Sequence, residues 1–436
     1  MVWHVLLYSG SAGFLKLAGF VVVLWLAKRL SVEDYATWGM LFSLQVAVSL
    51  FGAVGIVESV IALLRSCQTG QDRARLFAAA NAVGVVNLGV AILFAAVLYV
   101  LVAGRAWDAL YTYCWVAGSG GLLAVSSLQA QFVRLEEKHT ASLYFNFIAP
   151  LSGLIGSVVA VAIQMSAWSY YMGATIGLAV ALIYGRARGI GAFHCTKSIG
   201  ECRPILARVA PFIAVAFLGW LSGYGNNYVT ELLFDSKEVA KCALAFMLAG
   251  LMQLVATAMN QVWSPRFYRL IKDRPAEEVE ARNRRFFQGE AVVLGITGAL
   301  LVYFFPIAAG LIGGNLANYE SMRLELLLLV IGYISIVPFW HCQNYLLAFD
   351  KGPAMMRIHF VSSLIGVGVL VALLLWLGPL GIYLGFLVQM VLRSAAAVTV
   401  TRRRWRIAIG WEGLLAGAGI AVVGFLAGWG GAAFAP

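Results

Sequence analysis

Charged residues are scarce in this sequence, and their scarcity excludes a soluble globular protein. Only 12% of the 436 residues are Asp, Glu, Lys or Arg, whereas 61% are hydrophobic and the mean hydropathy is +0.86. A water-soluble chain of this length needs far more polar surface, so lipid is the solvent for most of the chain. Cysteine is also rare, and the six scattered cysteines predict no disulfide framework.

Motifs for catalysis and metal binding are missing as well. The sequence has no P-loop, no nucleophile motif and no cluster of metal-binding carboxylates. His194, Cys195 and Cys202 form a loose group, but their spacing fits no usual zinc pattern. We therefore predict no metal, no cofactor, no catalytic residues and no enzymatic activity.

Long apolar stretches make up nearly the whole chain. A bilayer core about 30 Å thick requires about 20 helical residues, a length that every stretch meets. The stretches are continuously apolar rather than alternating, which favours helices over the strands of a membrane barrel. We expect the first to be a retained helix, because it lacks the basic region that opens a signal peptide. The stretches are 3–28, 37–64, 77–103, 107–133, 141–165, 167–185, 205–230, 240–264, 286–312, 324–349, 355–377, 380–401 and 407–432.

Lysine and arginine are concentrated on every second loop between these stretches. If the N-terminus is cytoplasmic, the inner loops hold most of the 31 basic residues, and this bias predicts a cytoplasmic N-terminus. The net charge of +11 then predicts anionic membrane lipids as partners and no nucleic acid, because no soluble basic domain is present. The exceptions are Lys28, Arg29, Arg105, Lys237, Lys241 and Arg323 on outer loops and Lys16 and Arg393 inside spans.

The longest loop, about 265–285, is rich in arginine and glutamate. Its pattern predicts a short amphipathic helix on the inner membrane surface. A topological anchor and a docking site are both open interpretations of this loop.

Two segments of similar pattern divide the chain into halves. LAKRLSVEDYATWGMLFSL (26–44) and ELLFDSKEVAKCALAFML (231–248) each place an acid in a short outer loop before a small residue that opens the next helix. Parallel repeats of this kind form a cavity where the lobes meet. The predicted fold is therefore an all-α polytopic membrane protein with two six-helix lobes around a central cavity. The lobes span 1–190 and 205–401, a cytoplasmic linker spans 191–204, and a thirteenth transmembrane helix spans 407–432.

Parts of these two segments, LAKRLSVEDYATWG (26–39) and FDSKEVAKC (234–242), together with LGPLGIYLGF (377–386), resemble signatures of the polysaccharide flippases of the multidrug/oligosaccharidyl-lipid/polysaccharide exporter superfamily. The resemblance covers about residues 5–405. The glycine that the family places after the loop aromatic is Ala36 in the first copy and Ala240 in the second. An Asp-Arg pair expected near the end of the seventh helix is absent, with Asn226 and Asn227 in that neighbourhood.

The resemblance implies that the protein flips a polyprenyl-diphosphate-linked oligosaccharide, such as an O-antigen unit, across the inner membrane of a bacterium. Alternating access during cell-surface polysaccharide biosynthesis is the implied mechanism, with a glycan polymerase or other assembly proteins as partners. A multidrug exporter of the same superfamily is the alternative, although it would favour an acidic interior. A glycan polymerase or ligase would need a large outer loop, and the outer loops here are short.

The two cations within spans are the predicted substrate-binding residues. Lys16 lies about 18 Å from either end of its helix, too far for its side chain to reach water fully. A cation at the membrane centre costs upward of ~2.5 kcal/mol unless it faces water or a partner. We predict that Lys16 and Arg393 line the cavity, the alternative being buried ion pairs. Glu58 is then either the structural partner of Lys16 or a group that titrates or binds a cation during transport.

Polar residues elsewhere in the spans are predicted to contact sugars, and arginines at the inner mouth are predicted to bind the diphosphate. Amides hydrogen-bond well to sugar hydroxyls but also hold transmembrane helices together, and both roles stay open. Arg208 and Arg357 would capture a diphosphate by charge-assisted hydrogen bonds, or serve only as topological anchors. The predicted sugar-contacting residues are Asn81, Gln253, Asn260, His341 and Asn344.

Overall fold

The computed structural model describes residues 2–64, 67–103, 107–191, 194–349, 351–403, 405, 407 and 409–432. Throughout these residues the chain is helical with short connections, and they include no strand. Contacts divide the chain into two compact units. The first is Met1–Leu26, Leu30–Trp220 and Asn227–Ala240, and the second is Ala27–Arg29, Leu221–Asn226 and Lys241–Pro436. The domain boundaries set out above stay predictions. Four arginines of the predicted loop pattern, Arg65, Arg105, Arg404 and Arg406, lie outside the described residues.

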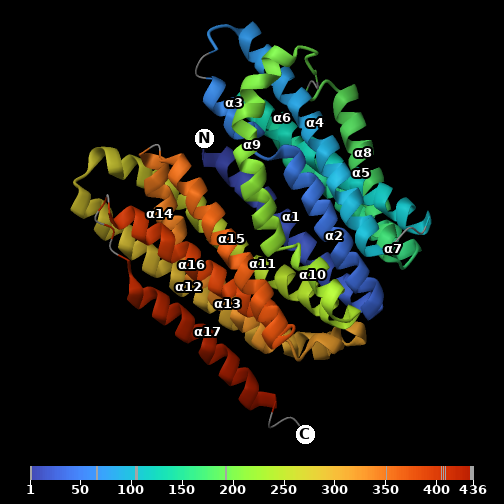
Figure 1. Ribbon diagram of the computed structural model, residues 1–436, viewed down its shortest axis with the longest axis vertical. Helices are drawn as coiled ribbons and strands as arrows, with labels where there is room; N and C mark the ends of the chain where they lie inside the picture. Colours follow the sequence, from blue (N-terminus) through green and yellow to red (C-terminus); the bar gives the residue numbers. More distant parts are fainter. Residues whose placement is uncertain are drawn as a thin grey trace. The chain divides into compact units, whose positions relative to one another are not determined.

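The first unit is a bundle built around α2 and α5. α2 packs against α4 and α5, α5 packs against α8, and α7 packs against α8 (Figure 1). The elements that form most of this unit are α1 (Val2–Arg29), α2 (Val32–Ala53), α3 (Ile56–Leu64), α4 (Gly70–Ala103), α5 (Trp107–Leu135), α6 (His139–Leu143), the π-helix η1 (Tyr144–Ile148), α7 (Ala149–Ile163), α8 (Ala167–Ala187), α9 (Ile199–Ser222) and α10 (Asn226–Leu233).

The second unit is held together by three helix pairs. α12 packs against α17, α15 against α16, and α13 against α16. An ion pair of 2.6 Å between Arg284 and Glu412 joins α12 to the start of α17. The elements are α11 (Ser236–Asp273), α12 (Ala276–Ile312), the 3-10 helix η2 (Gly314–Tyr319), α13 (Arg323–Ser335), α14 (Val337–Ala348), α15 (Gly352–Leu377), α16 (Leu380–Arg402) and α17 (Trp411–Ala432).

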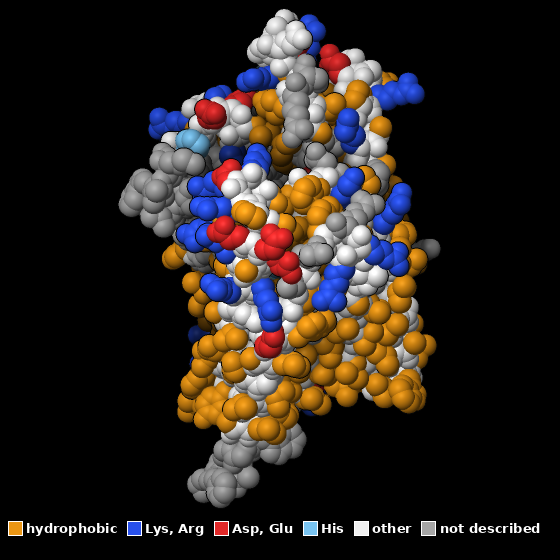
Figure 2. Space-filling view, turned by 90° about the vertical axis from the view of Figure 1, so that its left-hand side faces the viewer, with side chains coloured by type: hydrophobic (Ala, Val, Ile, Leu, Met, Phe, Trp, Pro, Cys, Tyr) orange, Lys and Arg blue, Asp and Glu red, His pale blue; other side chains and the backbone are white. Residues whose placement is uncertain are grey.

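The helical membrane fold predicted from the apolar stretches is confirmed. In the described part, 11 helical segments are long and apolar enough to cross a membrane, or 12 if the bent pair Ile199–Ala210 and Phe212–Ser222 is one span. On the face drawn in Figure 2, hydrophobic side chains cover the lower part and charged side chains gather above them. The predicted thirteenth stretch coincides with α17, and its crossing of the membrane stays a prediction.

The two repeated segments open their helices in the same way. Ser31 caps α2 by accepting a hydrogen bond from the backbone N–H of Asp34 at 3.0 Å. Asp235 accepts one from the backbone N–H of Glu238 at 3.0 Å at the start of α11. Side-chain oxygens at these positions satisfy backbone donors that a helix N-terminus leaves unpaired. The small residues that follow, Ala36 and Ala240, are both buried.

The prediction of a short amphipathic surface helix at about 265–285 is wrong. α11 continues to Asp273 and α12 begins at Ala276, so the two spanning helices themselves extend to form a hairpin. Pro275 interrupts the helix because it lacks a backbone N–H, and it precedes the first residue of α12. Glu278 pairs with Arg274 at 3.7 Å and with Arg282 at 2.5 Å, which stabilises the start of α12.

Candidate functional site

Arg393 is a charged side chain on a spanning helix that is held by neutral groups. Its Nη2 donates to the Ser363 hydroxyl at 2.7 Å and its Nε to the Ser362 hydroxyl at 3.4 Å, and both serines are buried on α15. Among the described residues, no Asp or Glu lies within ion-pair distance of its half-buried guanidinium. A membrane cation without a carboxylate is costly unless water or an anion faces it. The arrangement therefore leaves a positive charge available to an anionic ligand.

The three other predicted substrate-binding cations have exposed side chains. Lys16 lies on α1 between Phe14 and Leu17, which are 55% and 53% exposed. Arg208 lies on α9, and Arg357 lies near the start of α15. In the described part of the chain none of the three forms an ion pair. The common cavity predicted for these cations stays a prediction.

Glu58 lines a hollow of about 710 Å³ in the first unit. The hollow opens where α2 ends and α3 begins. Gly55 has φ +71° there, and a Cβ at this position would lie 2.9 Å from the Cβ of Phe212. The interruption between α2 and α3 therefore requires glycine. The carboxylate of Glu58 is exposed and makes no ion pair with Lys16 among the described residues. Polar groups on the same wall are Gln45, Ser49, Ser127 and Gln131.

This hollow has the chemistry of a carbohydrate or cation site. Amides and hydroxyls donate and accept hydrogen bonds, as sugar hydroxyls do, and one carboxylate attracts positive charge. Gln45 is fixed in place, because its amide nitrogen donates to the buried hydroxyl of Ser119 at 2.9 Å. The functional role of Glu58 stays a prediction.

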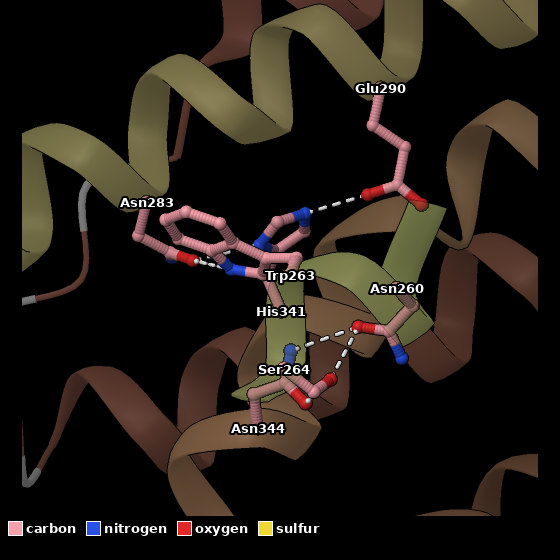
Figure 3. Close-up of polar contacts among 7 residues, drawn as sticks. All are labelled: Asn260, Trp263, Ser264, Asn283, Glu290, His341 and Asn344. Atoms are coloured by element: carbon pink, nitrogen blue, oxygen red, sulfur yellow. Dashed lines mark hydrogen bonds and ion pairs between the residues drawn. The ribbon is translucent and has the colours of Figure 1, made fainter. Parts of the chain in front are cut away.

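A polar network in the second unit brings together two of the predicted sugar-contacting residues, Asn260 and Asn344 (Figure 3). Asn344 on α14 donates to Asn260 on α11 at 3.1 Å. The Ser264 hydroxyl lies 3.0 Å from each of the two amide oxygens and donates its single proton to one of them at a time. Asn344 is buried, and these contacts join α11 to α14 in the manner of polar residues that hold helices together.

His341, another predicted sugar-contacting residue of the second unit, contacts two residues of α12 (Figure 3). Its Nδ1 lies 2.9 Å from the amide oxygen of Asn283, which also accepts from the indole N–H of Trp263 at 3.0 Å. Because that oxygen only accepts, Nδ1 carries a proton. Its Nε2 lies 2.9 Å from Oε2 of Glu290. The contact therefore holds one proton, on the imidazole or on the carboxyl.

Glu290 is the functional candidate that sequence reasoning missed. Glu58 was the carboxylate considered within the spans, but Glu290 is 1% exposed and lies inside the predicted stretch 286–312. A carboxylate within an apolar run was the signal that could have found it. Its Oε1 has no hydrogen-bond partner among the described residues.

Asn81 and Gln253 differ in their surroundings. Asn81 is buried, donates to the backbone oxygen of His194 at 3.1 Å and accepts from Gln129 at 3.1 Å. It therefore anchors the connection before α9 onto α4. Gln253 is exposed on α11. In the described part of the chain, no group of three or more His, Cys, Asp or Glu is placed to hold a metal.

The fold of the chain is that of solved membrane transporters and flippases. A lipid II flippase, MurJ, in an inward closed conformation superposes with a TM-score of 0.72 at 13% identity over 97% of this chain and 92% of that one. A multidrug resistance MATE family transporter of the MOP superfamily gives TM-scores of 0.66 at 12% identity inward-facing and 0.56 at 13% identity outward-facing. Each comparison covers 92% of this chain and 94% of the other.

The sequence itself then places the chain in a family. The family model described as polysaccharide biosynthesis protein matches residues 2–271, so the chain belongs to that family. The resemblance drawn from the loop motifs is thereby confirmed. No curated protein sequence matches the chain.

Proposed function

We propose that this protein flips a polyprenyl-diphosphate-linked oligosaccharide from the inner to the outer leaflet of a bacterial cytoplasmic membrane. Membership of the polysaccharide biosynthesis family and the MurJ-like fold support a lipid-linked substrate. The N-terminus lies on the cytoplasmic side in this proposal, and a glycan polymerase or other assembly proteins receive the product.

Arg393 is the observation that carries the proposal. A cation held by two serine hydroxyls among spanning helices matches a ligand that brings its own negative charge into the membrane. A diphosphate is such a ligand, whereas a cationic drug would be repelled. The multidrug exporter remains the alternative because Glu58 offers an exposed carboxylate in the hollow of the first unit.

Substitution of Arg393 tests the proposal. We expect Arg393→Ala to reduce flipping of a fluorescent polyprenyl-diphosphate oligosaccharide in proteoliposomes about tenfold or more, because a hydrogen bond to a charged group contributes about 1.5–3 kcal/mol. Arg403→Ala, which removes an exposed arginine just beyond the same helix, is the matched control and should leave flipping unchanged.

Two results would contradict the proposal. One is normal flipping by the Arg393→Ala protein at wild-type levels in the membrane. The other is efflux of cationic drugs that Glu58→Gln abolishes, with no movement of the lipid-linked oligosaccharide by the wild type. The second result would establish the multidrug exporter.

A further inference from the structure

The hairpin of α11 and α12 extends well beyond the hydrocarbon core of a membrane. The helices contain 38 and 37 residues, which corresponds to about 57 Å and 55 Å of helix against a core of about 30 Å. Their apolar parts lie far from the turn at Arg274 and Pro275, and the residues near the turn are charged. The end of the hairpin therefore lies at the level of the lipid headgroups or beyond them.

A pocket of about 620 Å³ lies between the two helices at this end. Five arginines line it, together with a single acid, Asp273. The arginines are Arg266, Arg269 and Arg274 from the α11 side and Arg282 and Arg285 from α12.

The positive charge of this pocket is only partly neutralised. Glu278 pairs with Arg274 and Arg282. Within the described residues, neither Arg266 nor Arg285 has an Asp or Glu at ion-pair distance, and both are exposed. Two guanidinium groups in one concave site present several donors to a single anion, and their planar geometry suits phosphate oxygens.

The pocket also has a rigid aromatic wall. The rings of Trp263 and Phe286 stack with centroids 4.5 Å apart and an interplanar angle of 9°. The indole N–H of Trp263 donates to Asn283 at 3.0 Å, which fixes the ring. An apolar wall beside a cationic hollow suits a molecule with a charged head and a hydrocarbon or sugar part, and tryptophan is favoured at this membrane depth.

We propose that this pocket binds the phosphate group of a membrane lipid. The guanidinium groups of Arg266 and Arg285 donate hydrogen bonds to the phosphate oxygens. The ligand class is a phosphate or diphosphate ester, which an anionic phospholipid and a polyprenyl diphosphate both supply. The site is separate in the chain from Arg393, and its occupancy is measured without any transport step.

The test measures binding to the full chain in nanodiscs of zwitterionic lipid. Three probes are used: inorganic pyrophosphate, phosphatidylglycerol in the bilayer, and a short polyprenyl diphosphate in the bilayer. The variant Arg266→Gln/Arg285→Gln removes the two guanidinium groups proposed to bind the phosphate. The matched control Arg73→Gln/Arg75→Gln removes two exposed arginines near the start of α4 that are predicted to lie on the same side of the membrane.

We expect Arg266→Gln/Arg285→Gln to raise the Kd for at least one of the lipid probes about tenfold or more, while the control changes it less than twofold. A loss confined to polyprenyl diphosphate identifies the lipid carrier as the ligand, and a loss that includes phosphatidylglycerol identifies bulk anionic lipid. Wild-type binding of pyrophosphate alone, equal losses in both variants, or no loss in either would overturn the proposal.

A second variant keeps the test decisive if the glutamine variant does not fold. Arg266→Lys/Arg285→Lys retains both charges for folding and topology but lacks the planar guanidinium groups. Weaker binding of the lipid phosphate by this variant supports the proposal, and unchanged binding refutes it.

Discussion

The contact between Glu290 and His341 joins two buried polar side chains of the second unit. Both side chains are buried, and their polar atoms meet at 2.9 Å. Removing one partner from such a pair strands a polar or charged group in the interior, whereas replacing both with apolar residues is often tolerated. The pair therefore ties α12 to α14 through an interaction that depends on both members.

We expect Glu290→Leu or His341→Phe alone to lower the free energy of unfolding by about 3–5 kcal/mol, because each leaves an uncompensated group. The double variant should recover much of this loss. Thermal melting of the purified protein in one detergent measures the effect. A double variant less stable than either single one would show that the two residues are not coupled. Glu58→Leu serves as control, since Glu58 is exposed and unpaired in the described part.

The close approach of helix backbones at glycine residues is the main feature at the scale of elements. α7 and α8 approach so closely that a Cβ at Gly156 would overlap the carbonyl oxygen of Gly173, and a Cβ at Gly173 that of Gly156. Gly177 meets the carbonyl of Ser152 in the same way. Small residues allow this approach in membranes, where dispersion contacts replace the hydrophobic effect as the force between helices.

Substitution of Gly173 by Ala should destabilise the first unit by about 1–3 kcal/mol, because the added methyl group must push two backbones apart. Gly89→Ala on α4 is the matched control, since a Cβ there meets nothing within 4 Å. Comparison of the two melting temperatures checks the prediction. Equal melting temperatures would mean that α7 and α8 separate without cost.

Charge distribution is the feature that acts on the whole molecule. Basic residues gather on alternate loops, and this bias sets the direction in which a chain inserts. The exposed residues Lys138, before α6, and Lys237, at the start of α11, belong to loops predicted to lie on opposite sides. Their accessibility reports the orientation of the chain.

We expect a membrane-impermeant maleimide to label Lys237→Cys in intact spheroplasts and Lys138→Cys only after permeabilisation. Both variants are made in a chain whose six cysteines are replaced by serine. The reverse pattern would place the N-terminus outside and would contradict the predicted topology.

Much of the fold was predictable from the sequence because helix formation in a membrane is local. The stretches 167–185 and 380–401 correspond to α8 (Ala167–Ala187) and α16 (Leu380–Arg402). Every backbone group must bond within its own segment in lipid, so apolar length alone indicates a helix. The break at Gly55 was missed, since it depends on the approach of Phe212 from a distant helix.

The amino-acid sequence by itself determined that the chain is a helical membrane protein, where most of its apolar helices lie and which loops are basic. These properties depend on local hydropathy and charge. Only the tertiary structure decided which polar groups are paired. His341 meets Glu290, and Asn344 meets Asn260, whereas the hydrogen bonds that Arg393 makes within the described residues go to serine hydroxyls. Partners of this kind lie on different helices, so their pairing depends on how the helices pack, which local sequence does not specify.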